Sequence, residues 1–148
     1  MGKYKGKKGT PANVIPQGKL QRYANRVNGL MGKNGGKITP LQIVKDAENH
    51  RSPLHEYFEW DNSKAAHEWR LQQARVLLGA VVQVVVVSGK RKEHRSFFNV
   101  HDVVTKEKVY VTLETAIKTK SYRDELIDKI IRHLGESQSL LGLFKSQK

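Results

Sequence analysis

The chain has 148 residues, no cysteine and a formal net charge of +13. This length suits one domain, or a smaller domain with a basic arm. The absence of cysteine excludes disulfide bonds, cysteine-based zinc sites and thiol nucleophiles. The start of the chain is too polar for a signal peptide, and no apolar run is long enough for a membrane span. We therefore expect an intracellular protein that is not embedded in a membrane.

Positive charge is concentrated at the N-terminal end of the chain. Residues 1–37 contain nine basic side chains and no Asp or Glu, whereas the remaining residues carry 18 basic and 14 acidic side chains. The nine are Lys3, Lys5, Lys7, Lys8, Lys19, Arg22, Arg26, Lys33 and Lys37. Residues 1–18 are rich in Lys, Gly and Pro and have little to bury, which predicts a disordered basic arm.

Helical spacing of apolar residues begins directly after this arm. Leu20–Leu30 predicts a short basic helix that ends in a Gly-rich linker, so residues 19–37 form one segment. The run Thr39-Pro40-Leu41-Gln42 has the residues of a capping box with Pro at the first helical position, which predicts a helix to about Asn49. The longest helix is predicted over residues 63–79, and its broad apolar surface places it at the centre of the domain.

The second half of the chain predicts a sheet. The β-branched run over residues 80–87 is typical of a strand, and a cationic loop follows at residues 88–92. Two further strands are predicted over residues 96–104 and 109–114. Because the connections are too short for parallel crossovers, the three strands should form an antiparallel meander.

An amphipathic helix over residues 121–134 is predicted to follow the sheet. The expected fold class is α+β, with N-terminal helices, a three-stranded antiparallel meander and a C-terminal amphipathic helix, preceded by the disordered arm. Four segments are expected: the arm (1–18), the basic helix with its linker (19–37), a single α+β domain (38–135) and a C-terminal tail (136–148).

A long basic segment without acidic residues favours a polyanionic partner, because each phosphate that Lys or Arg neutralises releases counterions. The alternative is a merely solubilising tail. Nucleic acid is the partner we predict, with DNA favoured over RNA. Besides the nine N-terminal cations, the candidate phosphate-binding residues are Lys64, Arg70, Lys90, Arg91 and Lys92.

Three helices followed by a hairpin also outline a winged helix-turn-helix, in which residues 90–92 would form the wing. The opposing interpretation is that the helix over residues 63–79 is simply the core helix under the sheet. A third group of candidates is aromatic, since such side chains can stack on bases. For Tyr57, Phe58, Trp60 and Trp69 we favour core positions, with Tyr57 as the exception.

No arrangement of residues indicates catalysis. The sequence contains no recognisable Ser-His-Asp set, pair of buried carboxylates or phosphate-binding glycine loop. His50 and His55, with nearby Glu56 and Glu59, match no standard zinc spacing. We therefore predict a protein that is not an enzyme and that uses no metal or cofactor.

Three segments resemble a set of small proteins encoded by tailed bacteriophages and prophages. They are Ile38-Thr39-Pro40, the stretch Ser-Pro-Leu-His-Glu-Tyr-Phe-Glu-Trp-Asp at residues 52–61, and Trp-Arg-Leu-Gln-Gln-Ala-Arg at residues 69–75. The resemblance covers roughly residues 38–135 and leaves the basic arm outside. It implies a phage origin and a location in the host cytoplasm or the virion, and it implies no particular activity.

The leading hypothesis is therefore a phage-encoded nucleic-acid-binding protein whose cationic arm contacts phosphates. Two other hypotheses remain open: a virion structural or assembly protein, and an adaptor to an acidic host protein. A homo-oligomer, or a phage or host protein partner, is compatible with all three.

Overall fold

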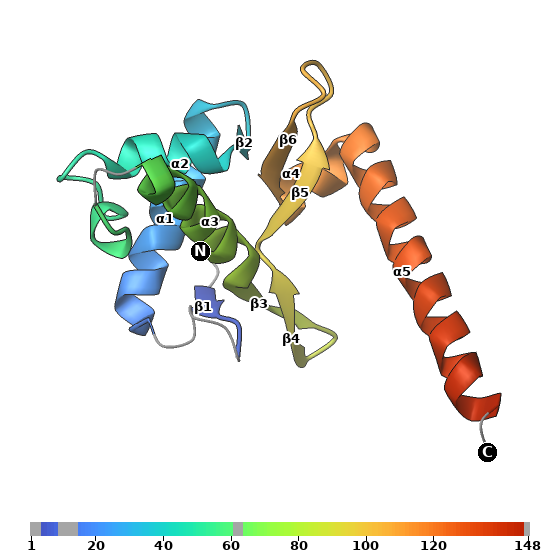
Figure 1. Ribbon diagram of the computed structural model, residues 1–148. Helices are drawn as coiled ribbons and strands as arrows, with labels where there is room; N and C mark the ends of the chain where they lie inside the picture. The colour runs from blue at the N-terminus through green and yellow to red at the C-terminus, as the bar shows by residue number, and fades with distance from the viewer. Residues whose placement is uncertain (1–3, 9–14, 61–63, 147–148) are drawn as a thin grey trace.

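The computed structural model describes residues 4–8, 15–60 and 64–146, and these residues form a mixed α+β fold, as predicted (Figure 1). The sheets are two small antiparallel ones of three strands each. In chain order the elements are β1 (Tyr4–Gly6), α1 (Gln17–Lys33), β2 (Lys37–Ile38), α2 (Pro40–Ala47), the 3-10 helix η2 (His55–Tyr57), α3 (Lys64–Ala80), β3 (Val81–Val87), β4 (Lys90–Arg95), β5 (Phe97–His101), β6 (Lys108–Thr112), α4 (Leu113–Lys118) and α5 (Lys120–Ser146).

The main hydrophobic core lies among α1, α2 and α3. Helix α1 is amphipathic as predicted, and its buried side chains recur at helical spacing: Leu20, Tyr23, Ala24, Val27 and Met31. The broad apolar surface of α3 meets them through Ala74, Leu77 and Leu78. Helix α3 is therefore a core helix, which agrees with the more conservative of its two interpretations.

The capping box before α2 is confirmed. The Thr39 hydroxyl accepts the backbone N–H of Gln42 at 3.2 Å, and the Gln42 side chain accepts the backbone N–H of Thr39 at 2.8 Å. Pro40 occupies the first helical position, where its missing N–H costs nothing. Helix α2 ends at Ala47, close to the predicted residue. Its start could be predicted because the capping signals lie within four consecutive residues.

The predicted single meander is wrong, because the strands are divided between two sheets with the orders β1-β3-β4 and β2-β6-β5. The segment that we expected to be a cationic loop contains only a two-residue turn, Ser88–Gly89, after which β4 begins at Lys90. Both turn residues have positive φ, 51° and 73°, as a type I′ hairpin turn requires. The sequence does not predict strand β4, because its residues, Lys-Arg-Lys-Glu-His-Arg, do not alternate between apolar and polar.

Each sheet includes one strand from the basic N-terminal region, β1 in one sheet and β2 in the other. Residues 4–6 lie within the segment expected to be disordered, but they form β1 and pair with β3. The backbone N–H of Tyr4 donates to the Gln21 side chain at 3.0 Å, and the N–H of Lys7 donates to the Ala80 carbonyl at 2.7 Å. Main-chain hydrogen bonds to an open sheet edge order this segment, and composition alone does not reveal them. Residues 1–3 and 9–14 of the expected arm lie outside the described residues.

The C-terminal amphipathic helix is confirmed, but α5 is much longer than predicted. It runs from Lys120 to Ser146 and includes most of the residues that we assigned to a separate tail. Its first half packs against α4 and β5, where Tyr122 is buried, and the rest projects from the body (Figure 1). No helix in the described part of the chain is long and apolar enough to cross a membrane.

The aromatic residues between α2 and α3 are largely core residues, as favoured. Phe58 is buried, and the ring of Trp60 stacks on His55 with a centroid distance of 4.9 Å. The expectation that Tyr57 is the exception is wrong, because this side chain is partly buried and packs against the same core. The expectation for Trp69 is wrong: this side chain is 52% exposed on α3, because it points away from the helix face that carries Ala74, Leu77 and Leu78.

Candidate nucleic-acid interface

The cations of α1 are held in ion pairs. Lys19 and Arg22 lie one turn apart, and both reach the carboxylate of Glu56, at 3.0 and 3.1 Å. The Tyr23 hydroxyl donates to the same carboxylate at 3.0 Å. The hydrogen bond from Lys19, followed by that from Tyr23, keeps the pKa of Glu56 below its usual value. A phosphate at these two cations would compete with Glu56 for their positive charge.

Arg26 is tied more firmly, to a carboxylate that is 90% buried. Its guanidinium donates to both carboxylate oxygens of Asp46, and the Nε bond measures 3.1 Å. The Ser52 hydroxyl donates to Asp46 at 2.6 Å. Burial would raise the pKa of Asp46, but the hydrogen bonds from Arg26 and Ser52 outweigh it and lower this pKa. The network joins α1, α2 and the segment before α3.

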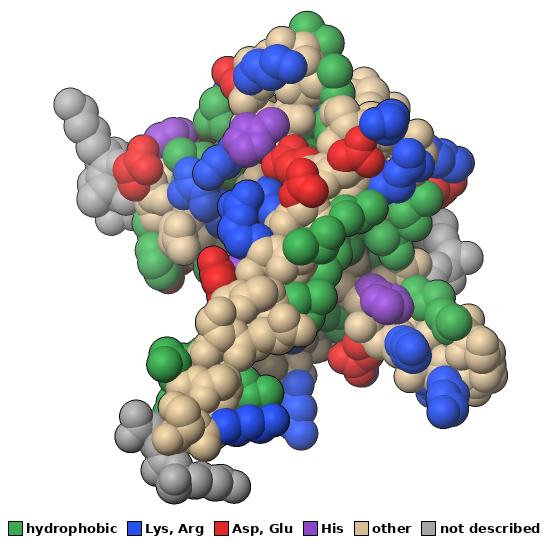
Figure 2. Space-filling view, turned by 90° about the vertical axis from the view of Figure 1, so that its right-hand side faces the viewer, with side chains coloured by type: hydrophobic (Ala, Val, Ile, Leu, Met, Phe, Trp, Pro, Cys, Tyr) green, Lys and Arg blue, Asp and Glu red, His purple; other side chains and the backbone are tan. Residues whose placement is uncertain are grey.

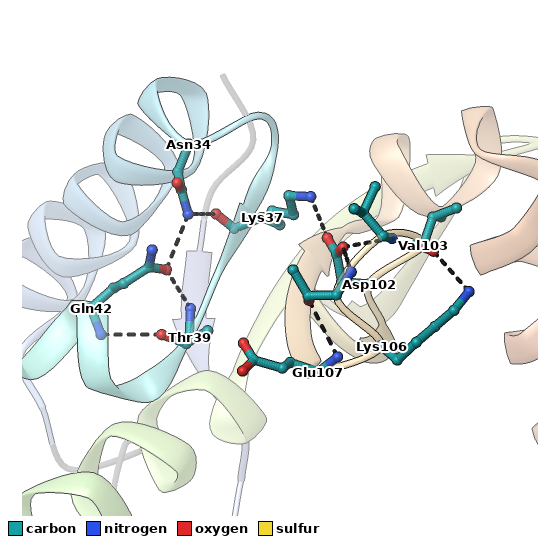
Figure 3. Close-up of polar contacts among 10 residues, drawn as sticks. Asn34, Lys37, Thr39, Gln42, Asp102, Val103, Lys106 and Glu107 are labelled. Carbon is teal, nitrogen blue, oxygen red and sulfur yellow. Dashed lines mark hydrogen bonds and ion pairs between the residues drawn. The ribbon is translucent and has the colours of Figure 1, made fainter.

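Lys37 forms the third pair, with Asp102 (Figure 3). The Asp102 side chain is only 2% exposed, and it also accepts the backbone N–H groups of Val104 and Thr105, both at 2.9 Å. The hydrogen bond from Lys37, followed by those backbone bonds, holds the pKa of Asp102 well below its usual range. This pair links β2 to the turn after β5, so Lys37 has a structural role.

Five of the nine N-terminal cations are thus paired with carboxylates that lie later in the chain, since Lys5 also pairs with Glu93. Lys8 and Lys33 are exposed, and Lys7 makes contacts of its own. Lys3 and the side chain of Lys64 lie outside the described residues. The sequence could not reveal this compensation, because the partners are 20 to 88 residues away and come together only by folding.

The predicted cations of the hairpin are arranged differently. Lys90, Arg91 and Lys92 are exposed at the start of β4, and they face Val87, Val86 and Val85 across the hairpin. Side chains alternate along a strand, so Arg91 lies on one face of the ribbon, and Lys90 and Lys92 lie on the other. In the described part of the chain, none of the three forms an ion pair.

The position of this hairpin suits contact with a large partner. Strand β4 is an edge strand, and the turn between β3 and β4 extends away from α1, α2 and α3 (Figure 1). Arg95 lies four residues beyond Arg91, on the same face and also exposed. Arg95 is not among the candidates that the sequence indicates, because its pattern predicts a loop at residues 88–92. Only the strand register shows that Arg91 and Arg95 share a face.

The other predicted cation on α3 has a contact with an aromatic ring. The guanidinium of Arg70 lies 5.1 Å from the centre of the Trp60 ring and donates to the Glu59 carbonyl at 3.2 Å. Residues 48–63 separate α2 from α3 and include η2. This connection is much longer than the three- to four-residue turn of a helix-turn-helix. The geometry therefore gives the helix-turn-helix interpretation no support.

No family model, curated protein or solved structure matches the chain. Within the described residues, no group of three or more His, Asp or Glu side chains is placed to hold a metal ion. On the β3–β4 hairpin, the exposed cations Lys90, Arg91 and Lys92 form no ion pair with any of the residues that the structure describes.

Proposed function

We propose that this protein binds nucleic acid, and that the β3–β4 hairpin is its principal contact. The observation that carries the proposal is the run Lys90-Arg91-Lys92 on an exposed hairpin, with cations on both faces of the ribbon. Exposed cations that form no ion pair attract phosphates and release their counterions, and the neighbouring carboxylate of Glu93 is already paired with Lys5. The paired cations of α1, β1 and β2 offer less, because their charge is already compensated.

The shape of the hairpin supports a nucleic-acid groove as its place of contact. A two-stranded ribbon fits the major groove of B-DNA, which is about 12 Å wide. A ribbon inside a groove has a phosphate backbone on each side. Because Arg91 and its two neighbours point to opposite faces, they can reach both backbones at once. Phosphate contacts of this kind fix position and carry no sequence preference of their own.

The net charge of +13 supports the proposal at longer range. Ion pairs remove local charge but leave the total unchanged, so the whole molecule still attracts a polyanion. This attraction would speed the encounter, and the hairpin would make the close contacts. Both contributions weaken as salt screens the charges.

The test compares two pairs of substitutions at opposite ends of the molecule. Arg91→Gln with Lys92→Gln removes two hairpin charges, and Lys106→Gln with Lys108→Gln removes two charges near the turn between β5 and β6. Binding to duplex DNA, single-stranded DNA and RNA is measured by fluorescence anisotropy over a range of salt. We expect the first pair to weaken binding about tenfold at low salt, and to reduce the salt slope on duplex DNA by about 2.

The second pair is the matched control, because it lowers the net charge equally at another exposed site. We expect it to change affinity only slightly. If both pairs weaken binding to the same extent, the attraction comes from net charge alone and the hairpin has no special role. If the unaltered protein binds none of the three probes at low salt, the proposal of nucleic-acid binding is refuted.

A further inference from the structure

An apolar stripe runs along α5 from Ile127 to Phe144 and has no partner over its projecting half in the described part of the chain. Its large side chains are between 45% and 70% exposed: Ile127, Ile130, Leu134, Leu141 and Phe144. Their spacings, together with Ser137, are those of positions a and d in successive heptads. This pattern is the one by which a helix packs against another helix.

The stripe is continuous with an apolar groove on the body of the protein. The groove has a volume of about 430 Å³ and lies between α5, α4 and β5. Phe98 and Ile117 line one side, and Ile127 and Ile130, the first residues of the stripe, line the other. Figure 2 shows hydrophobic side chains gathered along this face beside α5. A helix lying along the stripe would therefore enter the groove.

The composition of the projecting half indicates that it needs such a partner. Residues 131–146 are all exposed, and they include Gly135, Gly142 and three serines. Each glycine costs about 1 kcal/mol relative to alanine in a helix. Short helices without tertiary contacts are marginal in water even when their propensity is high. A helix with this sequence gains its stability by packing its apolar stripe.

We propose that the partner is a second copy of this chain, with its α5 antiparallel to the first. In an antiparallel pair of helices, position a of one faces position d of the other. In one register, every a position of the stripe faces a d position of the other helix, and this register places Ile127 against Phe144 of the partner subunit. It likewise places Ile130 against Leu141 of the partner subunit. Each C-terminal end then enters the groove of the other subunit, so two grooves and two stripes are covered by one symmetric contact.

Charge complementarity favours the same register. Asp124 and Lys145 both occupy position e, and in an antiparallel pair the e positions face each other. The register set by the apolar residues brings Asp124 opposite Lys145 of the partner subunit. A parallel pair would leave this match unmade, and it would leave both grooves open. The inference concerns assembly and does not depend on nucleic-acid binding.

The first experiment measures the mass of the unaltered protein by sedimentation equilibrium. We expect a dimer at about 100 μM, well above the Kd of a complex of micromolar affinity. Leu141→Glu with Phe144→Glu places charges on the stripe and should give the mass of one chain, 16.8 kDa. Ser139→Glu changes a residue on the opposite side of α5, and this control should remain dimeric.

The second experiment tests the register. Asp124→Lys alone and Lys145→Asp alone should each weaken the dimer, because like charges then meet, and both changes together should restore it. Circular dichroism shows whether each variant still folds. A monomeric unaltered protein refutes the proposal, and so does a dimer that survives Leu141→Glu with Phe144→Glu. Failure of the charge swap to restore association would rule out the antiparallel register.

Discussion

At the scale of single residues, five of the N-terminal cations that the sequence predicts as phosphate contacts form ion pairs within the protein. The Arg26–Asp46 pair is the most buried of those on α1, and a guanidinium that donates two parallel bonds is a strong and directional partner. The pairs at Glu56 are more exposed, so water and salt screen them. These pairs stabilise the helical core and leave fewer cations free for a polyanion.

We expect Asp46→Ala to lower the free energy of unfolding by about 2 kcal/mol at neutral pH, because it leaves Arg26 and Ser52 without their shared acceptor. Urea denaturation measures the loss. The pKa of Asp46 is lowered in the folded state, so its contribution is present above the unfolded pKa of about 3.9 and declines as pH falls below that value.

The difference between the unaltered protein and the Asp46→Ala variant should therefore be smaller at about pH 3 than at pH 7. Arg22→Met is the comparison, because it removes one cation from an exposed pair and should change stability little. An equal loss for Asp46→Ala at both pH values would show that the charge of Asp46 does not contribute.

At the scale of elements, the β3–β4 hairpin and helix α5 both extend beyond the body. The hairpin carries exposed cations that form no ion pair within the described residues, and α5 carries an apolar stripe of the kind that a compact domain buries. The hairpin depends on its turn, since a type I′ turn matches the twist of the strands that it joins. Gly89 has a φ of +73°, and a Cβ there would meet nothing within 4 Å, so a larger residue would suffer only backbone strain.

We expect Gly89→Val to destabilise the hairpin by roughly 1–2 kcal/mol, the cost of holding a residue with a Cβ in the left-handed region. Hydrogen exchange of the β3 and β4 amides would show faster opening. Ser88→Asn should have the opposite effect, because Asn tolerates positive φ in this turn. Slower or unchanged exchange after Gly89→Val would contradict the described turn.

At the scale of the whole molecule, the basic N-terminal region is part of the folded domain. Strand β1 joins one sheet, β2 joins the other, and α1 places five side chains in the core. Residues 19–37, which we expected to form a segment separate from the domain at 38–135, therefore contribute to its core and to one of its sheets. Removing residues 1–37 would therefore unfold the protein, so such a deletion cannot serve as a test of phosphate contacts in this region.

We expect deletion of residues 1–37 to prevent cooperative unfolding. Loss of one large buried side chain costs 2–5 kcal/mol, so loss of all those on α1 exceeds the roughly 5–15 kcal/mol by which a domain is stable. Thermal unfolding followed by circular dichroism tests this. A control that lacks only Gly2 and Lys3 should unfold like the full chain. A cooperative transition at the original temperature in the long deletion would show that α1 is dispensable.

Sequence by itself determined the α+β class, the capping box at Thr39, the buried face of α1 and the amphipathic start of α5, because these depend on periodicity and on signals within a few residues. The tertiary structure alone decided that the strands form two sheets, that residues 4–6 pair with β3, and that Asp46, Glu56 and Asp102 neutralise N-terminal cations. The physical reason is distance along the chain. Strand partners and carboxylates far apart in sequence meet only in the folded molecule, so composition counts their charges without showing which remain unpaired.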